Sequence, residues 1–222
     1  MGSLYLWITQ ADHAAFDLIN KSLTCGLFDA VMPVLSNPRA WAAPLGIAWI
    51  IFFIRADRRG RYIALGCFLI VGATDQVSSH IIKGQVQRVR PCNVLPVTHL
   101  YLNGSWLTTD STGQRMYKNS FSFPSGHATN IAGQAAYWSF FYPPVAPVMI
   151  VAAALVGYSR VYVGHHWPSD VLGGYLLGII IAFTIWYALR TWVLPDRNRF
   201  QSTTITSRHS ARVPKEKNEH AN

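Results

Sequence analysis

The sequence contains few charged residues for its length. Only 13% of its 222 residues are Asp, Glu, Lys or Arg, whereas 50% are hydrophobic and the mean hydropathy is +0.18. A soluble domain usually carries about 25% charged residues. The deficit disfavours a soluble globular protein and indicates a chain that lies in lipid.

Cysteine is also scarce. The three cysteines, Cys25, Cys67 and Cys92, are too few and odd in number, so they do not form a disulfide framework. Residues 1–12 lack a basic region before their apolar stretch and contain no small-residue cleavage site, so we expect no secretory signal there.

Acidic residues are outnumbered by basic ones. The chain has 19 Lys and Arg against 10 Asp and Glu, which gives a net charge of +9. Such a charge is compatible with nucleic-acid binding, but the basic residues are not gathered into one folded stripe. Four arginines lie in residues 55–61, and further basic residues follow position 190. We therefore expect charged flanks of membrane segments and no nucleic-acid partner.

Six apolar stretches indicate the architecture. A membrane-spanning helix needs about 20 mainly apolar residues. Only the last stretch reaches that length without including polar residues at one end. The others must carry polar residues at one end, which a bundle tolerates when those residues face its interior. We expect six helices, the first partly interfacial and weakest. The stretches lie at 14–35, 40–54, 62–74, 128–142, 145–158 and 171–194.

The expected fold is therefore all-α: a six-helix transmembrane bundle with a long loop between helices 3 and 4. Positive loops face the cytoplasm, so the arginine-rich loop 55–61 belongs inside, and the 84–125 and 160–169 loops are expected outside. Residues 1–195 form one domain in this reading. Residues 196–222 are basic and polar, which is typical of a disordered cytoplasmic tail.

Three segments differ from the lipid-facing background, and all three end on the same expected face. Together they provide cations, two histidines, a carboxylate and a small-residue turn at a helix start. A phosphate needs several fixed positive donors, and the planar fork of arginine can contact two of its oxygens. The segments are KGQVQRVRP at 83–91, PSGH at 124–127 and SRVYVGHHWPSD at 159–170.

The spacing of these residues predicts a phosphate-transfer site. A helix that begins near Pro168 would let Asp170 reach one ring nitrogen of His166, leaving the other nitrogen free to attack. His127, from another helix, is the expected general acid. Gly126 allows close approach at a helix N-terminus, where free N–H groups attract anions.

At these motifs the sequence resembles the type 2 phosphatidic acid phosphatase (PAP2) superfamily, with the signatures KxxxxxxRP, PSGH and SRxxxxxHxxxD. The resemblance implies a membrane bundle with an extracytoplasmic site and no cofactor or metal. It implies that His166 forms a phosphohistidine, Asp170 orients it and His127 protonates the leaving group. The phosphoryl oxygens would then be held by Lys83, Arg90, Ser125, Gly126 and Arg160.

Other interpretations remain open. The group His127, His165, His166 and Asp170 has the spacing of a partial zinc site, but three cations nearby oppose a divalent metal. Arg88 is expected to be a solvated neighbour rather than a second phosphate contact. Trp106 and Trp167, near segment ends, are expected to be interface anchors.

The expected function is removal of phosphate from a lipid in a bacterial inner membrane. Undecaprenyl diphosphate and phosphatidate are the substrates expected first, with phosphatidylglycerol phosphate and lipid A phosphates as alternatives. Vanadium-dependent haloperoxidases and soluble acid phosphatases share the motifs, but the long apolar segments argue against both. A non-catalytic lipid-binding or transport module is the alternative of another class, since polar intramembrane residues also serve transport. The sequence leaves the oligomeric state open.

Overall fold

The computed structural model describes residues 2–109 and 120–194 and is mainly helical. The chain divides into two compact units, Met1–Tyr187 and Ala188–Asn222. The expected basic tail at 196–222 and part of the long loop lie outside the described residues. All candidate site residues lie in the first unit.

The expected first helix is divided by a sharp turn. Helix α1 (Gly2–Asp17) continues into the π-helix η1 (Leu18–Ser22), and α2 (Gly26–Ser36) follows at an angle of 118°. Before this turn, Asn20 is fully buried and its side-chain amide donates to the carbonyls of His99 and Tyr162, both at 2.7 Å. A polar residue inside an apolar stretch thus joins two distant parts of the chain.

The next two helices form a hairpin. Helix α3 (Pro38–Arg55) begins after Asn37, whose side chain accepts a hydrogen bond from the backbone of Arg39. Helix α4 (Arg58–Asp75) begins after Asp57, whose carboxylate accepts from Gly60. Both are standard N-terminal caps, and the Asp57 cap lies within the arginine-rich connection expected from the sequence.

Helix α4 continues into the long loop through elements that the sequence did not predict. It passes into the π-helix η2 (Gln76–Ile82) and the short α5 (Lys83–Val86), and a 3₁₀ turn, η3 (Pro91–Asn93), follows. Lys83 was expected to close the third helix. It instead begins α5, and the helical backbone ends at Gln87, which has a left-handed φ of 50°.

The long loop also contains a β-hairpin, which corrects the all-α expectation. Strands β1 (His99–Leu102) and β2 (Ser105–Thr108) pair antiparallel, with Tyr101 opposite Trp106. Their two-residue turn is Asn103-Gly104, and both residues have positive φ. Asn-Gly is the preferred sequence for such a turn, so a local signal for this hairpin was present in the sequence.

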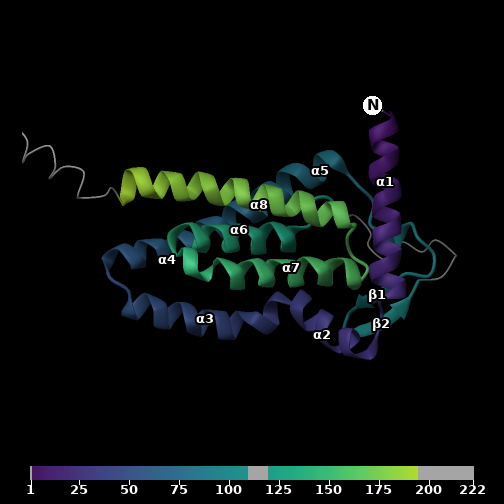
Figure 1. Ribbon diagram of the computed structural model, residues 1–222, viewed down its shortest axis with the longest axis horizontal. Helices are drawn as coiled ribbons and strands as arrows, with labels where there is room; N and C mark the ends of the chain where they lie inside the picture. The colour runs from purple at the N-terminus through teal and green to yellow at the C-terminus, as the bar shows by residue number, and fades with distance from the viewer. Residues whose placement is uncertain (1, 110–119, 195–222) are drawn as a thin grey trace, which may run out of the picture. The chain divides into compact units, whose positions relative to one another are not determined.

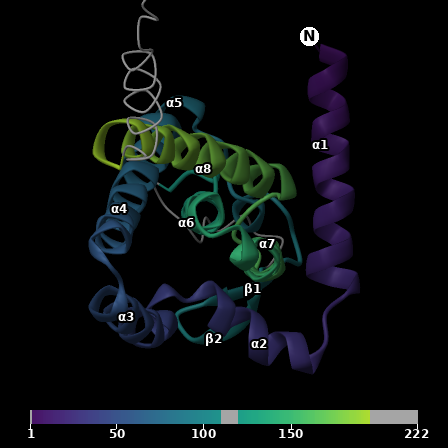
Figure 2. The same ribbon diagram turned by 60° about the vertical axis from the view of Figure 1, so that its left-hand side comes forward.

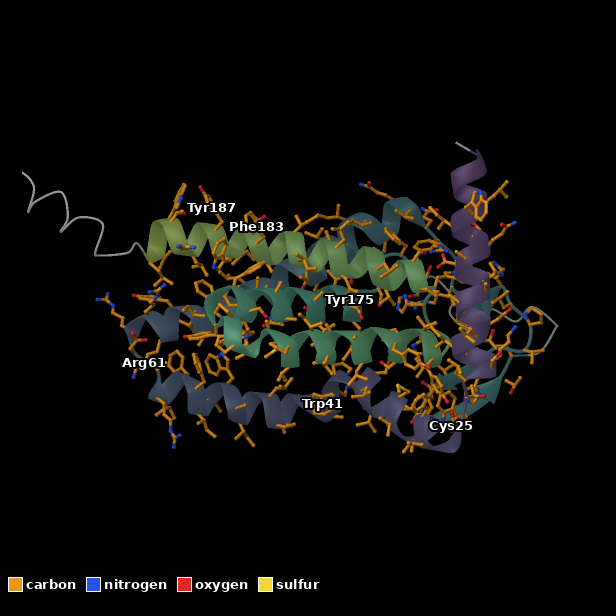
Figure 3. The ribbon with its side chains drawn as sticks, viewed as in Figure 1. Cys25, Trp41, Arg61, Tyr175, Phe183 and Tyr187 are labelled. Atoms are coloured by element: carbon orange, nitrogen blue, oxygen red, sulfur yellow. The ribbon has the colours of Figure 1, made fainter. Side chains whose placement is uncertain are left out.

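Three long helices complete the first unit. Helix α6 (Gly126–Phe141) packs against α4 and, after the turn η4 (Pro143–Val145), against α7 (Ala146–Tyr162). Helix α8 (Pro168–Ala188) continues as η5 (Leu189–Val193). Tyr175 lies on the α7 side of α8 and donates to the carbonyl of Ala153 at 2.6 Å (Figure 3).

Helix α8 approaches α6 closely at two of its three glycines. A Cβ at Gly174 would lie 2.8 Å from the Ser125 carbonyl oxygen. A Cβ at Gly178 would lie 2.8 Å from the Gly133 nitrogen and would also meet the carbonyl of Thr129. Small residues four positions apart allow backbones in a membrane to touch in this way.

Three helical segments in the described part of the chain are long and apolar enough to cross a membrane: Arg58–Asn93, Pro143–Tyr162 and Pro168–Val193. The bent pair Leu6–Ser22 and Gly26–Ser36 makes a fourth if it is counted as one span. Helices α3 and α6 do not meet this criterion of length and composition. The criterion therefore supports three or four spans, and the six-helix membrane bundle stays a prediction.

The arrangement of the first unit places the chemically interesting residues at one end. Helices α3, α4, α6 and α7 run alongside one another, whereas α1 crosses near the end that holds the β-hairpin (Figures 1 and 2). The last turn of α7 and the first turns of α6 and α8 lie at that same end (Figure 1). The 55–61 connection lies at the opposite end.

Candidate active site

Arg90 and His166 meet at the hairpin end of the bundle. Nη1 of Arg90 lies 3.2 Å from Nε2 of His166 and donates to the His165 carbonyl at 2.9 Å, and Nη2 donates to Ser120 at 2.9 Å. Both side chains are buried, with 6% and 2% of their surface exposed. The structure thus brings the 83–91 and 159–170 segments together at these two residues.

A backbone carbonyl fixes the orientation of the His166 ring. Nδ1 lies 2.9 Å from the carbonyl oxygen of Ser122. Because a carbonyl oxygen only accepts hydrogen bonds, Nδ1 must carry the proton when this bond forms. The lone pair is then on Nε2, the nitrogen that faces Arg90.

Asp170 lies near His166 but does not form the expected hydrogen bond to its ring. Its Oδ2 is 3.7 Å from Nδ1 of His166 and instead accepts from the Trp167 backbone N–H at 2.8 Å. The 3.7 Å separation exceeds hydrogen-bond distance. The carboxylate thus caps the start of α8 instead of binding the ring. Trp167, expected at the membrane interface, is 4% exposed.

Arg88 is not a solvated neighbour, as the sequence had suggested. Nη1 donates to Asp170 at 2.8 Å and to Ser169 at 2.6 Å, and Nη2 pairs with Asp12 of α1. Asp12 is 3% exposed and Asp170 is fully buried. Arg88 therefore links two buried carboxylates and connects α1 to the start of α8.

Arg160 contributes a second buried guanidinium from the last turn of α7. Nη1 donates to the hydroxyl and the carbonyl of Ser36, at the end of α2, and Nη2 lies 2.6 Å from Nδ1 of His165. Nε2 of His165 lies 2.9 Å from the Tyr101 carbonyl. His165 thus positions an arginine, in keeping with a structural rather than a reactive role.

Lys83, Ser125 and Gly126 lie close to these arginines. Lys83 is near enough to Arg90 and Arg160 for their charges to interact, and its Nζ would be 4.0 Å from a Cβ placed on Gly126. Ser125 precedes α6 and is fully buried, and its hydroxyl has no hydrogen-bond partner within residues 2–109 and 120–194. Its backbone N–H donates to the Asp170 carbonyl at 3.0 Å.

His127 is in the first turn of α6 and is half-buried. The backbone of Ser36 hydrogen-bonds its ring, and the charges of Lys83, Arg90 and Arg160 act on it. The second imidazole is therefore beside the same three cations as His166. All eight side chains or backbone positions selected from the sequence lie at this end of the unit.

Electrostatics in the 163–167 loop keeps both of its histidines neutral. Burial, followed by the positive charges of Arg90 and Arg160, lowers the pKa of His166 well below its usual value of 6.5. Burial and Arg160 lower the pKa of His165 in the same way. A neutral imidazole with a free Nε2 is the form that acts as a nucleophile.

Sequence reasoning missed the groups that hold the site in place. Ser122 orients His166, Ser36 binds Arg160, and the backbone of His165 binds Arg90. Two of these partners, Ser122 and His165, act through backbone carbonyls alone, which every residue possesses, so residue type gave no signal. The part of the chain that the structure describes holds no group of three or more His, Cys, Asp or Glu side chains arranged to bind a metal.

Comparison with known proteins places these motifs in a wider group. The sequence profile of the PAP2 superfamily matches residues 62–194. A phosphatidylglycerophosphatase B of Bacillus subtilis is 34% identical over 128 residues, which is 53% of this chain and 54% of that protein. An undecaprenyl-diphosphatase of Sulfolobus acidocaldarius is 33% identical over 137 residues, 61% of this chain and 58% of that protein. The chain thus spans somewhat over half the length of these curated relatives.

Two solved structures share the fold. Aquifex aeolicus LpxE superimposes with a TM-score of 0.56 at 24% identity, covering 78% of this chain and 92% of that one. A transmembrane PAP2-type phosphatidylglycerolphosphate phosphatase from Bacillus subtilis gives 0.52 at 27% identity, covering 82% and 92%. Together with the three apolar helical segments, these similarities indicate an integral membrane protein.

Proposed function

This chain belongs to the PAP2 superfamily, and on that premise we propose that it is a lipid phosphate phosphatase that works through a phosphohistidine on His166. The observation that carries the proposal is the environment of this imidazole. Nδ1 is held by the Ser122 carbonyl, and Nε2 faces the Arg90 guanidinium at 3.2 Å. A phosphoryl group placed there meets a nucleophile and a cation together.

In the first chemical step, Nε2 of His166 attacks phosphorus and the bond from phosphorus to the lipid oxygen breaks. Arg90, Arg160 and Lys83 offset the negative charge that the phosphoryl oxygens carry in the transition state. A bound phosphate dianion offsets the charges of Lys83, Arg90 and Arg160 that act on His127, so the ring holds a proton. His127 donates this proton to the departing oxygen of the lipid, which leaves protonated. Such a proton donor contributes about 10²–10⁴ in rate.

In the second step, water attacks the phosphohistidine. His127, which lost its proton in the first step, accepts one from the water as the new P–O bond forms. The bond from phosphorus to Nε2 breaks, inorganic phosphate is released and His166 returns to its neutral form. Asp170 favours the transient positive charge on the imidazole, because its carboxylate lies 3.7 Å from Nδ1.

The proposed placement in the membrane is a six-helix bundle with the site on the extracytoplasmic face of a bacterial inner membrane. Support comes from the arginine-rich 55–61 connection, which lies at the end of the bundle opposite the site (Figure 1). Positive short loops mark the cytoplasmic side. In this arrangement a lipid headgroup reaches the site from the outer leaflet.

The proposed substrates are undecaprenyl diphosphate or phosphatidate, with phosphatidylglycerol phosphate and lipid A phosphates as alternatives. The printed names of the relatives cover several of these classes: a phosphatidylglycerophosphatase, an undecaprenyl-diphosphatase and a lipid A 1-phosphatase from Rhizobium etli. The shared chemistry is a phosphate ester or anhydride on an apolar tail. Nothing in the eight site residues separates these substrates.

Phosphate release by the purified protein in detergent, measured over these four lipid classes, tests the proposal. We expect release from at least one class and loss of activity by at least about 10³-fold in His166→Ala. The matched control is His80→Ala, because His80 is exposed on η2. Full activity in His166→Ala would contradict the mechanism, and lipid binding without phosphate release would favour the non-catalytic alternative.

A further inference from the structure

The π-helix η2 changes which residue lies next to Lys83. In an α-helix, Ser79 would be one turn before Lys83, and its backbone carbonyl would accept the lysine N–H. Here the Lys83 N–H donates to the carbonyl of Ser78, five residues earlier. The wider turn therefore places the carbonyl of Ser78, rather than that of Ser79, one turn before Lys83. Single π turns inside helices are often found at functional sites.

Ser78 is buried in an unusual way. Its side chain has no exposed surface, and its hydroxyl lacks a hydrogen-bond partner among the residues that the structure describes. A buried hydroxyl without a partner costs about 1–3 kcal/mol relative to a satisfied one. By contrast, the neighbouring Ser79 hydroxyl donates to the Asp75 carboxylate at 3.3 Å.

The Ser78 hydroxyl is directed at the phosphate site. A Cβ placed on Gly126 would lie 3.7 Å from the Ser78 Oγ, 3.9 Å from the Ser79 Oγ and 4.0 Å from the Lys83 Nζ. Gly126 has no side chain, so these three polar groups lie around its Cα, at distances that would give a Cβ ordinary van der Waals contact.

We propose that Ser78 is a further phosphate-binding residue of this site, and that its hydroxyl donates to a phosphoryl oxygen held between Lys83 and the Gly126 backbone. The inference rests on the proposed function, since it concerns the same phosphate. The π turn pairs the backbone N–H of Lys83 with Ser78 in place of Ser79. Ser125, the residue before Gly126, is also buried with a hydroxyl that lacks a partner among the described residues.

A purely structural role for Ser78 predicts a different outcome. If the hydroxyl only fills space, its removal relieves an unsatisfied polar group, and the protein without ligand becomes no less stable. If it binds phosphate, the same variant also binds phosphate more weakly. Stability and affinity therefore separate the two roles.

The experiment measures binding of inorganic orthophosphate and orthovanadate to the full chain in detergent by calorimetry, with the thermal midpoint measured in parallel. We expect Ser78→Ala to bind both anions about tenfold or more weakly, because hydrogen bonds to charged groups are the strong ones. We expect its midpoint without ligand to be equal to or above that of the parent protein. Ser78→Cys keeps the volume with a weak donor and should weaken binding similarly.

Ser139→Ala is the matched control. Ser139 is on α6 and its hydroxyl donates to the Ala135 carbonyl at 2.6 Å. It should bind both anions as the parent does. Unchanged anion affinity in Ser78→Ala and Ser78→Cys would overturn the role of Ser78 and leave the proposed function intact. Failure of the parent protein itself to bind either anion would overturn both.

Discussion

Nδ1 of His166 hydrogen-bonds the backbone carbonyl of Ser122 at 2.9 Å, whereas the nearest Asp170 oxygen is 3.7 Å away. The tautomer of the proposed nucleophile is therefore set by the main chain of the loop that precedes α6. The carboxylate that sequence reasoning assigned to this task holds the start of α8 and Arg88 instead. Ser122 therefore orients the imidazole, and Asp170 holds Arg88 and the start of α8. The predictions that follow differ from those of a simple His-Asp pair.

The first prediction concerns pH. Burial and the charges of Arg90 and Arg160 lower the pKa of His166, so its active neutral form persists as pH falls below 6.5. Protonation of His166 should abolish its attack on phosphorus. We therefore expect the fall of kcat/KM at acid pH that is caused by this protonation to lie below pH 6.5. Arg160→Gln removes one of the positive charges that disfavour protonation of His166. The pKa of His166 should therefore rise, and the acid limb of kcat/KM should move to higher pH. A limb at or above pH 6.5 in the parent protein that is unmoved in the variant would contradict this assignment.

The second prediction concerns the link made by Arg88. Arg88→Met leaves the carboxylates of Asp12 and Asp170 buried without their cation. Removing one partner of a buried ion pair costs about 3–5 kcal/mol. We expect a loss of stability of that order, measured by denaturation in detergent.

Adding Asp12→Asn to Arg88→Met is the second arm of this test. It removes one of the two unpaired charges, so it should recover part of the stability. Equal stability of the parent, the single and the double variant would show that Arg88 is a solvated side chain after all.

A third prediction concerns metals. The proposed chemistry uses imidazoles and fixed cations, so phosphate release should continue in excess EDTA. The positive control is a metal-dependent phosphatase assayed in the same buffer, which should stop. Loss of activity that added Mg²⁺ or Zn²⁺ restores would count against the site as proposed.

The fourth prediction concerns the contact between α6 and α8. Gly178→Ala places a Cβ against the backbone of Thr129 and Gly133, so the helices must separate. Overpacking of this kind costs about 1–3 kcal/mol. The matched control is Gly72→Ala on α4, because a Cβ there would meet nothing within 4 Å. We expect a lower thermal midpoint for Gly178→Ala only. Equal midpoints for the two variants would contradict close packing at Gly178.

Much of the site followed from the sequence because its chemistry depends on residue type. Lys83, Arg90 and Arg160 are cations, His127 and His166 are imidazoles, and their spacing predicts helix ends that meet. The start of α8 at Pro168 and of α6 at Gly126 agrees with those expectations. The apolar stretches likewise marked the long helices, because lipid demands a composition that is visible without coordinates.

Features that depend on backbone geometry were decided by the tertiary structure. The turn at Asn20, the π-helix at 76–82 and the carbonyl that orients His166 leave no distinct mark in composition or spacing. The partners of Arg88 could not be predicted from the sequence either, because a basic residue in a loop is usually solvated. Only the packing of α1 placed Asp12 beside it. The sequence alone determined which chemical groups are present and roughly where helices lie. Folding determined which partner each group finds, because buried donors and acceptors must be satisfied by whatever the packed chain brings within reach.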